Sequence, residues 1–183
     1  MYDPLGIKKQ ENIAAYVISM WHIEDLMRAN GLDMAKVEEL LVEPLEVDDE
    51  TREGIRDWYE GIMESMKEQG LEQQGHLGEV EEVIAELEFL HSSLLDVFTD
   101  EEYVRAHAQA EPGIKALQEQ AGEDADGPIE TCFTAIYGVM LLRAQEKEVS
   151  PATAEAEAHM RALLERLSQH YRQMRKLPGV SLN

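Results

Sequence analysis

Residues 129–143 read IETCFTAIYGVMLLR, and this stretch decides the fold class. Its large apolar residues recur every three or four positions, which is the spacing of one face of an α-helix. The run contains none of the strict alternation of apolar and polar residues that is typical of a half-buried β-strand. The sequence therefore predicts a strongly apolar helix, which we extend to residue 148.

Helical spacing also covers most of the chain on either side of that stretch. It predicts longer helices over residues 7–30, 51–70 and 151–176, and one that starts at Gly75 or Gly78 and ends at residue 98. Shorter helices are predicted over residues 34–42 and up to residue 109, the latter capped by Thr99 or Asp100. We expect a single domain over residues 1–183 with a short C-terminal tail over residues 177–183. The expected fold is an all-α bundle of about four long helices with two or three short intervening helices.

Residues that end or start helices set the expected boundaries. Gly31 is a plausible end for the first helix, and Asp33 is a plausible N-cap for the next one. Ser150 followed by Pro151 is typical of a helix start. Residues 111–128 contain two prolines and three glycines, which predicts a short helix flanked by loops.

Charge and composition exclude several classes of function. The 183 residues carry 16 Lys and Arg against 38 Asp and Glu, a formal net charge of −22. Nucleic acid is therefore not an expected partner, because phosphate backbones are bound by clustered Lys and Arg. With Cys132 as the single cysteine, one chain builds no disulfide. No leader-like start or membrane-spanning stretch is evident, so we expect a cytoplasmic protein without a membrane partner.

Three ionisable residues fall on apolar helix faces. Glu24 lies near the centre of the face formed within residues 13–27, His91 lies in the stripe within residues 80–98, and Arg143 continues the face of the penultimate helix. Because unpaired buried charges are costly, we expect the three side chains to meet, with Glu24 accepting a hydrogen bond from Arg143 or His91. The pattern predicts a polar cluster enclosed by the long helices.

Four further residues are candidates for the same polar cluster. Arg28 follows Glu24 by one helical turn and can pair with it locally. Tyr16 and Tyr137 can supply hydroxyl groups, and Trp21 can form an aromatic wall. Two interpretations stay open: the cluster fixes the packing register of the bundle, or it lines a cavity where Arg143 holds an anionic group.

Metal, cofactor and nucleophile chemistry find little support in the sequence. Di-iron bundles use two Glu-x-x-His pairs, and this chain has one, Glu88 with His91. Cys132 lies on an apolar face, where cysteine behaves as a small hydrophobic residue. No glycine-rich phosphate loop or magnesium-binding acidic motif has the required spacing. We therefore predict no metal site, no cofactor and no catalytic residue.

The helix predicted over residues 51–70 carries an aromatic and methionine stripe. Its members share one helical face, and they are Ile55, Trp58, Tyr59, Ile62, Met63 and Met66. Such stripes are usually core, but Trp, Tyr and Met are also enriched at subunit interfaces. The stripe therefore leaves a homo-oligomer open as an alternative.

Three segments of this chain resemble an uncharacterised bacterial family of all-helical domain-of-unknown-function proteins. They are IAAYVISMWHIEDL from Ile13, ELEFLHSSLL from Glu86 and IYGVMLLR from Ile136. The resemblance implies a bacterial, single-domain helical protein and transfers no catalytic residue.

The leading functional hypothesis is binding of a small anionic ligand between helices, without enzymatic activity. The alternative is an interaction or structural module that acts as a homo-oligomer. The third is an acid–base or metal-dependent enzyme that uses Glu24 and His91.

Overall fold

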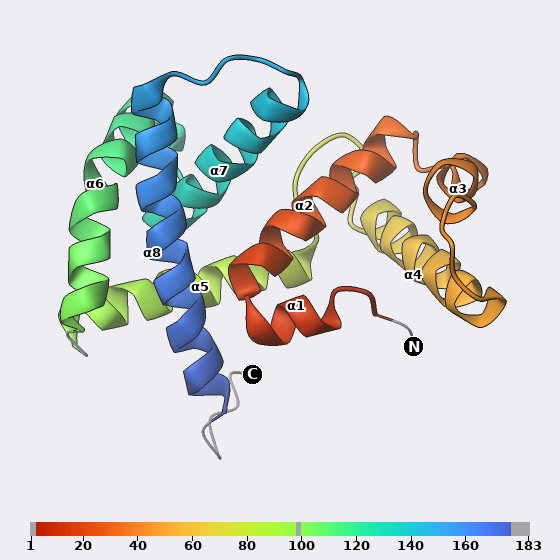
Figure 1. Ribbon diagram of the computed structural model, residues 1–183, viewed down its shortest axis with the longest axis horizontal. Helices are drawn as coiled ribbons and strands as arrows, with labels where there is room; N and C mark the ends of the chain where they lie inside the picture. The colour runs from red at the N-terminus through yellow and green to blue at the C-terminus, as the bar shows by residue number, and fades with distance from the viewer. Residues whose placement is uncertain (1–2, 98–99, 177–183) are drawn as a thin grey trace. The chain divides into compact units, whose positions relative to one another are not determined.

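The structure of the protein, a computed structural model, describes residues 3–97 and 100–176 (Figure 1). These residues form helices and connecting segments without a β-strand, which confirms the all-α class. The helices are α1 (Gly6–Glu11), α2 (Ile13–Ala29), α3 (Met34–Val37), α4 (Asp49–Glu68), α5 (Gly78–Asp96), α6 (Glu101–Ala121), α7 (Pro128–Ala144) and α8 (Pro151–Arg175). A π-helical turn, η1 (Glu38–Val42), follows α3, and a 3₁₀ turn, η2 (Gly122–Asp124), follows α6.

Helix starts and ends follow the expected local chemistry. The side chain of Asp33 accepts a hydrogen bond from the backbone N–H of Ala35, and that of Ser150 accepts one from Thr153. Asp100 caps α6 in the same way, and the expected Thr99 alternative lies outside the described residues. Gly31 has a φ of +67°, a left-handed conformation that suits glycine at a helix end.

The segment predicted as one helix over residues 7–30 is divided into α1 and α2. The break falls at Asn12, whose side chain donates to Glu165 of α8 at 3.3 Å. The backbone N–H of Ala14 donates to the hydroxyl of Ser168 on the same helix at 3.2 Å. In an unbroken helix, the backbone N–H of Ala14 would donate to a carbonyl oxygen of the same helix, but here the Ser168 hydroxyl accepts it. The periodicity of residues 7–30 gives no indication of this contact with α8.

The prediction of a short helix flanked by loops over residues 111–128 is wrong for its first half, because α6 continues without a break to Ala121. Pro112 lies inside this helix, where proline removes a backbone hydrogen bond. The next residue, Gly113, faces α8, and a Cβ placed there would lie 3.2 Å from the Cβ of Ala156. Burial of Ala110 and Ile114 on the same helix offsets the cost of the proline.

The chain separates into two compact units. The first comprises residues 1–10 and 15–82, and the second comprises residues 11–14 and 83–183. Helix α5 begins in the first unit and continues in the second. The expectation that residues 1–183 form a single domain stays a prediction.

In the first unit, α3 and η1 pack against α4. Its buried side chains come mainly from α2 and α4, and they include Tyr16, Val17, Met20, Ile23 and Met27 on α2 and Ile55, Ile62, Met63 and Met66 on α4. These are the residues that helical spacing places on the apolar faces, so local periodicity determines this core.

In the second unit, α8 packs against both α6 and α7, and α6 also contacts α7 (Figure 1). The buried side chains include Val83, Ile84, Leu87 and Leu94 on α5, Tyr103 and Ile114 on α6, Ile129, Phe133 and Ile136 on α7, and Met160, Leu163 and Leu167 on α8. Phe98, expected in the α5 stripe, lies outside the described residues, as does the tail from residue 177. None of the described helices is both long enough and apolar enough to cross a bilayer.

The proline inside α6 provides a test of this packing. Replacing Pro112 with Ala restores the missing backbone donor and should raise the free energy of unfolding by about 1–3 kcal/mol in urea titrations. The matched control is Pro151→Ala, because Pro151 occupies the first turn of α8, where proline costs little. Equal effects of the two changes would contradict a continuous α6.

Candidate functional site

Glu24 is fully buried in the first unit, where it binds the segment that leads into α5. One carboxylate oxygen lies 2.6 Å from Nδ1 of His76, and the other accepts the backbone N–H of Leu77 at 2.9 Å. Trp21 stacks on the His76 ring with centroids 4.2 Å apart. Helical periodicity places Glu24 in the core. It does not reveal the partners of Glu24, because residues 76 and 77 lie in the connecting segment before α5 and not on a helix face.

Arg28 and Tyr16 lie on the same helix as Glu24 and have other partners. The guanidinium of Arg28 donates to the carbonyl oxygens of Leu71 and Gly75 and pairs with Asp25. The ammonium of Lys9 lies over the ring of Tyr16, which is buried. Together, the hydrogen bonds of Glu24 and Arg28 hold the segment that connects α4 and α5, so both residues have a structural role.

His91 is buried in the second unit, and its Nδ1 lies 2.6 Å from the hydroxyl of Tyr103 on α6. The ring of His107 contacts it edge-on at 5.1 Å between centroids. Burial, helped by the positive form of His107 and opposed by Asp96, lowers the pKa of His91 to about 4. His91 is therefore neutral at pH 7.

Arg143 lies near the end of α7 with its side chain 51% exposed, so it is a surface residue and not a core one. It donates to Glu157 of α8 at 3.2 Å, and Arg161 binds the other carboxylate oxygen of Glu157. Tyr137, on the same helix as Arg143, is buried. The arginine escapes burial because it falls in the last turn of α7, where the apolar face ends.

Glu24 belongs to the first unit, whereas His91 and Arg143 belong to the second and have different partners there. The cavity that was expected to contain all three stays a prediction. The partners of Glu24 are 52 and 53 residues away in the sequence, whereas those of His91 and Arg143 are 12 and 14 residues away, on the next helix.

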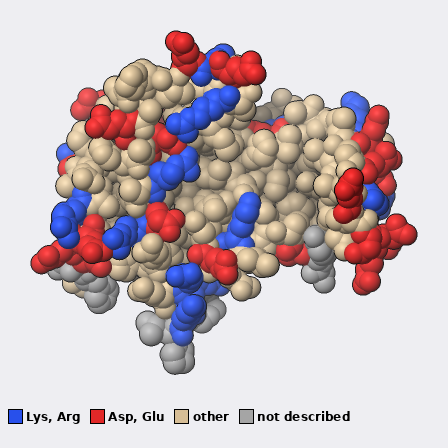
Figure 2. Space-filling model, in the orientation of Figure 1, with Lys and Arg blue, Asp and Glu red and all other residues tan. Residues whose placement is uncertain are grey.

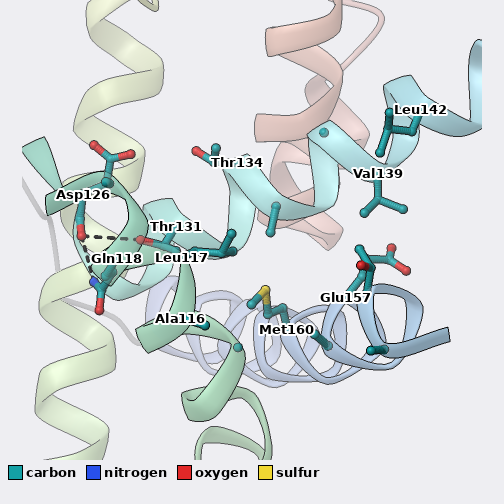
Figure 3. Close-up of a pocket in the computed structure, with 17 residues that line it drawn as sticks. Ala116, Leu117, Gln118, Asp126, Thr131, Thr134, Val139, Leu142, Glu157 and Met160 are labelled. Atoms are coloured by element: carbon teal, nitrogen blue, oxygen red, sulfur yellow. Dashed lines mark hydrogen bonds between the residues drawn. The ribbon is translucent and has the colours of Figure 1, made fainter. Parts of the chain in front are cut away.

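A cavity of about 570 Å³ lies within the second unit, between α6, α7 and α8 (Figure 3). Small residues line much of it, namely Gly113, Ala116 and Ala121 on α6, Ala135 and Gly138 on α7, and Ala152 and Ala156 on α8. Larger apolar walls come from Leu117, Val139, Leu142 and Met160. A Cβ on Gly138 would meet no atom within 4 Å, so the chain leaves this space unfilled.

The two ends of the cavity are polar (Figure 3). At one end, the Gln118 side chain donates to the carbonyl oxygen of Asp126 at 2.8 Å, and the Thr131 hydroxyl lies beside the same oxygen. At the other end lies the carboxylate of Glu157, beside Val139 and Leu142. Between the two ends the lining is mainly apolar, with Thr134 as a polar residue there (Figure 3). This distribution is found in many small-molecule sites.

A carboxylate from α5 holds the helix that forms one wall of this cavity. Oε1 of Glu88 accepts the backbone N–H groups of Ile129 and Glu130, which are free donors at the start of α7. Gly127 leaves room for this carboxylate, since a Cβ there would collide with it. Burial raises the pKa of Glu88, and these two hydrogen bonds oppose that shift.

Sequence reasoning missed the cavity because residues 111–128 were predicted as a short helix flanked by loops and not as the continuation of α6 to Ala121. A signal was present in the recurrence of small residues at helical spacing, with Ala152 and Ala156 four apart and Ala135 and Gly138 three apart. Such spacing is typical both of close helix packing and of a helix face that leaves space open. The two can be distinguished only when the partner helix is known.

The fold and cavity define an all-α protein with a three-helix cavity in its second unit. The chain belongs to the family described as Domain of unknown function (DUF4924), which matches residues 6–177. No curated protein and no solved structure matches the chain.

The buried carboxylate of Glu24 should contribute to stability. Glu24→Leu leaves His76 and the Leu77 N–H without this acceptor, and we expect it to lower the free energy of unfolding by about 2–4 kcal/mol. Hydrogen exchange at the Leu77 amide should accelerate. Asp25→Ala is the control: the Asp25 carboxylate is 48% exposed, and its loss should change stability by less than about 1 kcal/mol.

His91 should make the fold acid-sensitive. Because its pKa is lowered to about 4, the native state disfavours a proton that the unfolded chain accepts near pH 6.5. The free energy of unfolding should fall by up to about 3 kcal/mol as the pH decreases from 6.5 to 4. His91→Gln should flatten this part of the stability profile. The same change at exposed His22 should not, and an unchanged profile in His91→Gln would refute the assignment.

Proposed function

We propose that the second unit binds a small molecule whose apolar body occupies the cavity between α6, α7 and α8. The observation that carries this proposal is the cavity itself, about 570 Å³ in volume. Ligand pockets in proteins range from about 300 to 1,000 Å³ and combine apolar walls with a few polar groups. Both properties are present here.

The shape of the space supports the proposal. The cavity is partly open to solvent, so a ligand can enter it without separating the helices. In the second unit, α6 and α8 approach closely at Gly113, yet Gly138 on α7 faces open space. A longer side chain at position 138 could fill that space, so leaving it open forgoes apolar contacts that would stabilise the fold. A ligand that binds in this space would replace the apolar contacts that the chain itself does not make there.

A homo-oligomer formed through α4 is the second candidate. Trp58 and Tyr59 are only partly buried, and Trp58 lines a hollow of about 840 Å³ with Gly61 and Ser65. A charge of −22 on each copy opposes self-association, which is why we rank it lower. Acid–base catalysis through Glu24 and His91 ranks third, because each is buried against a neighbour of its own unit.

We also propose that the protein acts in the bacterial cytoplasm. An acidic surface suits a crowded aqueous compartment, and on the face in Figure 2 acidic and basic side chains are distributed over the surface around uncharged areas. Cys132 is a buried free thiol, which is compatible with a reducing environment.

The test fills the cavity. Gly138→Leu places a side chain in the open space and should reduce the affinity for decanol, an uncharged alkyl probe, by about tenfold or more in calorimetric titrations. Gly61→Leu is the matched control, because a Cβ at Gly61 on α4 also meets no atom within 4 Å. Absence of decanol binding to the unmodified protein, or equal binding by Gly138→Leu, would overturn the proposal.

A further inference from the structure

We propose that the ligand is an amphipathic anion, and that Arg143 and Arg161 bind its carboxylate at the Glu157 end of the cavity. This inference rests on the proposed function and adds the chemical class of the ligand. It follows from the way two arginines share one buried carboxylate.

Glu157 lies on α8 with its side chain only 6% exposed, and it lines the cavity. Its Oε1 accepts hydrogen bonds from Nε and Nη2 of Arg161, the former at 3.0 Å. Its Oε2 accepts from Nη2 of Arg143 at 3.2 Å. Both oxygens are therefore occupied by guanidinium groups, so a cationic ligand would have to displace an arginine to reach this carboxylate.

The cluster carries an excess of positive charge. Burial raises the pKa of Glu157, but the hydrogen bonds and charges of Arg161 and Arg143 outweigh it and lower that pKa overall. The carboxylate is ionised at pH 7, and two guanidinium groups against one carboxylate leave one net positive charge. In a chain with a net charge of −22, this is a local site of attraction for an anion.

Both arginines retain donors for a ligand. Their side chains are 51% and 57% exposed, and a guanidinium carries five N–H donors in a planar fork that matches a carboxylate. Arg143 directly follows Leu142, which lines the cavity. A ligand with its apolar body against Val139 and Leu142 would therefore have its polar end beside these guanidinium groups.

The opposite end of the cavity disfavours an anion. Asp126 lines that end, where its backbone carbonyl oxygen lies beside Gln118 and Thr131, and its carboxylate points away from these two side chains (Figure 3). The positive excess at one end and the acceptor oxygen of an acidic residue at the other give the cavity a polarity. An amphipathic anion is expected to bind in one orientation, with its carboxylate toward Arg143.

The experiment compares three probes with the same alkyl chain: decanoate, decanol and decylamine. Calorimetric titration of the full chain should give the tightest binding for decanoate and the weakest for decylamine. Arg143→Met should weaken decanoate binding by about tenfold and leave decanol within about twofold, because charge-assisted hydrogen bonds are lost. Arg161→Met should act in the same direction.

The matched control is Arg166→Met on α8, because Arg166 pairs with Glu102, whereas Arg143 and Arg161 pair with Glu157. It should leave the affinities of all three probes unchanged. Should Arg143→Met fail to fold, Arg143→Lys and a salt titration of the unmodified protein give the same information. Added salt should weaken decanoate binding and leave decanol binding unchanged.

The outcomes separate this inference from the proposed function. Equal affinity for decanoate and decanol, both reduced by Gly138→Leu, would overturn the anion assignment and leave the cavity as a binding site. A loss of stability in Arg143→Met without a change in decanoate affinity would make the arginines purely structural partners of Glu157. Failure of all three probes to bind would overturn both proposals.

Discussion

The close approach of α6 to α8 at Gly113 is the contact on which the second unit depends. A Cβ at this position would lie 2.9 Å from Cε of Met160 and 3.2 Å from the Cβ of Ala156, so a side chain here would require Met160 to move and Ala156 to shift slightly. Because these two helices meet here, α6 remains helical through Pro112, and its last turns become a wall. The cavity exists because the third helix, α7, contributes Gly138 to the space that remains.

A fully buried carboxylate in the first unit and a half-buried one in the second have a common role. Glu24 accepts the N–H of Leu77 before α5, and Glu88 accepts two N–H groups at the start of α7. Free backbone donors at a helix start attract negative charge, so these acids are satisfied by backbone as much as by side chains. An apolar helix face can therefore include such a carboxylate even where no Lys or Arg side chain is buried beside it. His91 is accommodated in the core in a different way, because its ring is neutral and forms a hydrogen bond with the hydroxyl of Tyr103.

Glu157 is the exception, since its partners are side chains at the surface. Two half-exposed guanidinium groups hold a carboxylate that is almost fully buried, so the positive charge faces solvent while the negative charge lies against the cavity. In a chain this acidic, such an arrangement concentrates basic character at one end of a mainly apolar space. The same geometry both stabilises an ionised Glu157 and leaves guanidinium donors for a ligand.

The sequence by itself determined the all-helical class, the caps at Asp33 and Ser150, and the burial of Glu24 and His91, because these follow from local spacing and side-chain chemistry. Only the tertiary structure decided that α6 continues past Pro112, that Glu88 caps α7 and that Arg143 pairs with Glu157. Each of these depends on contacts between different helices. Periodicity reports which face of a helix is apolar, but it contains no information on which helix covers that face or what space is left between them.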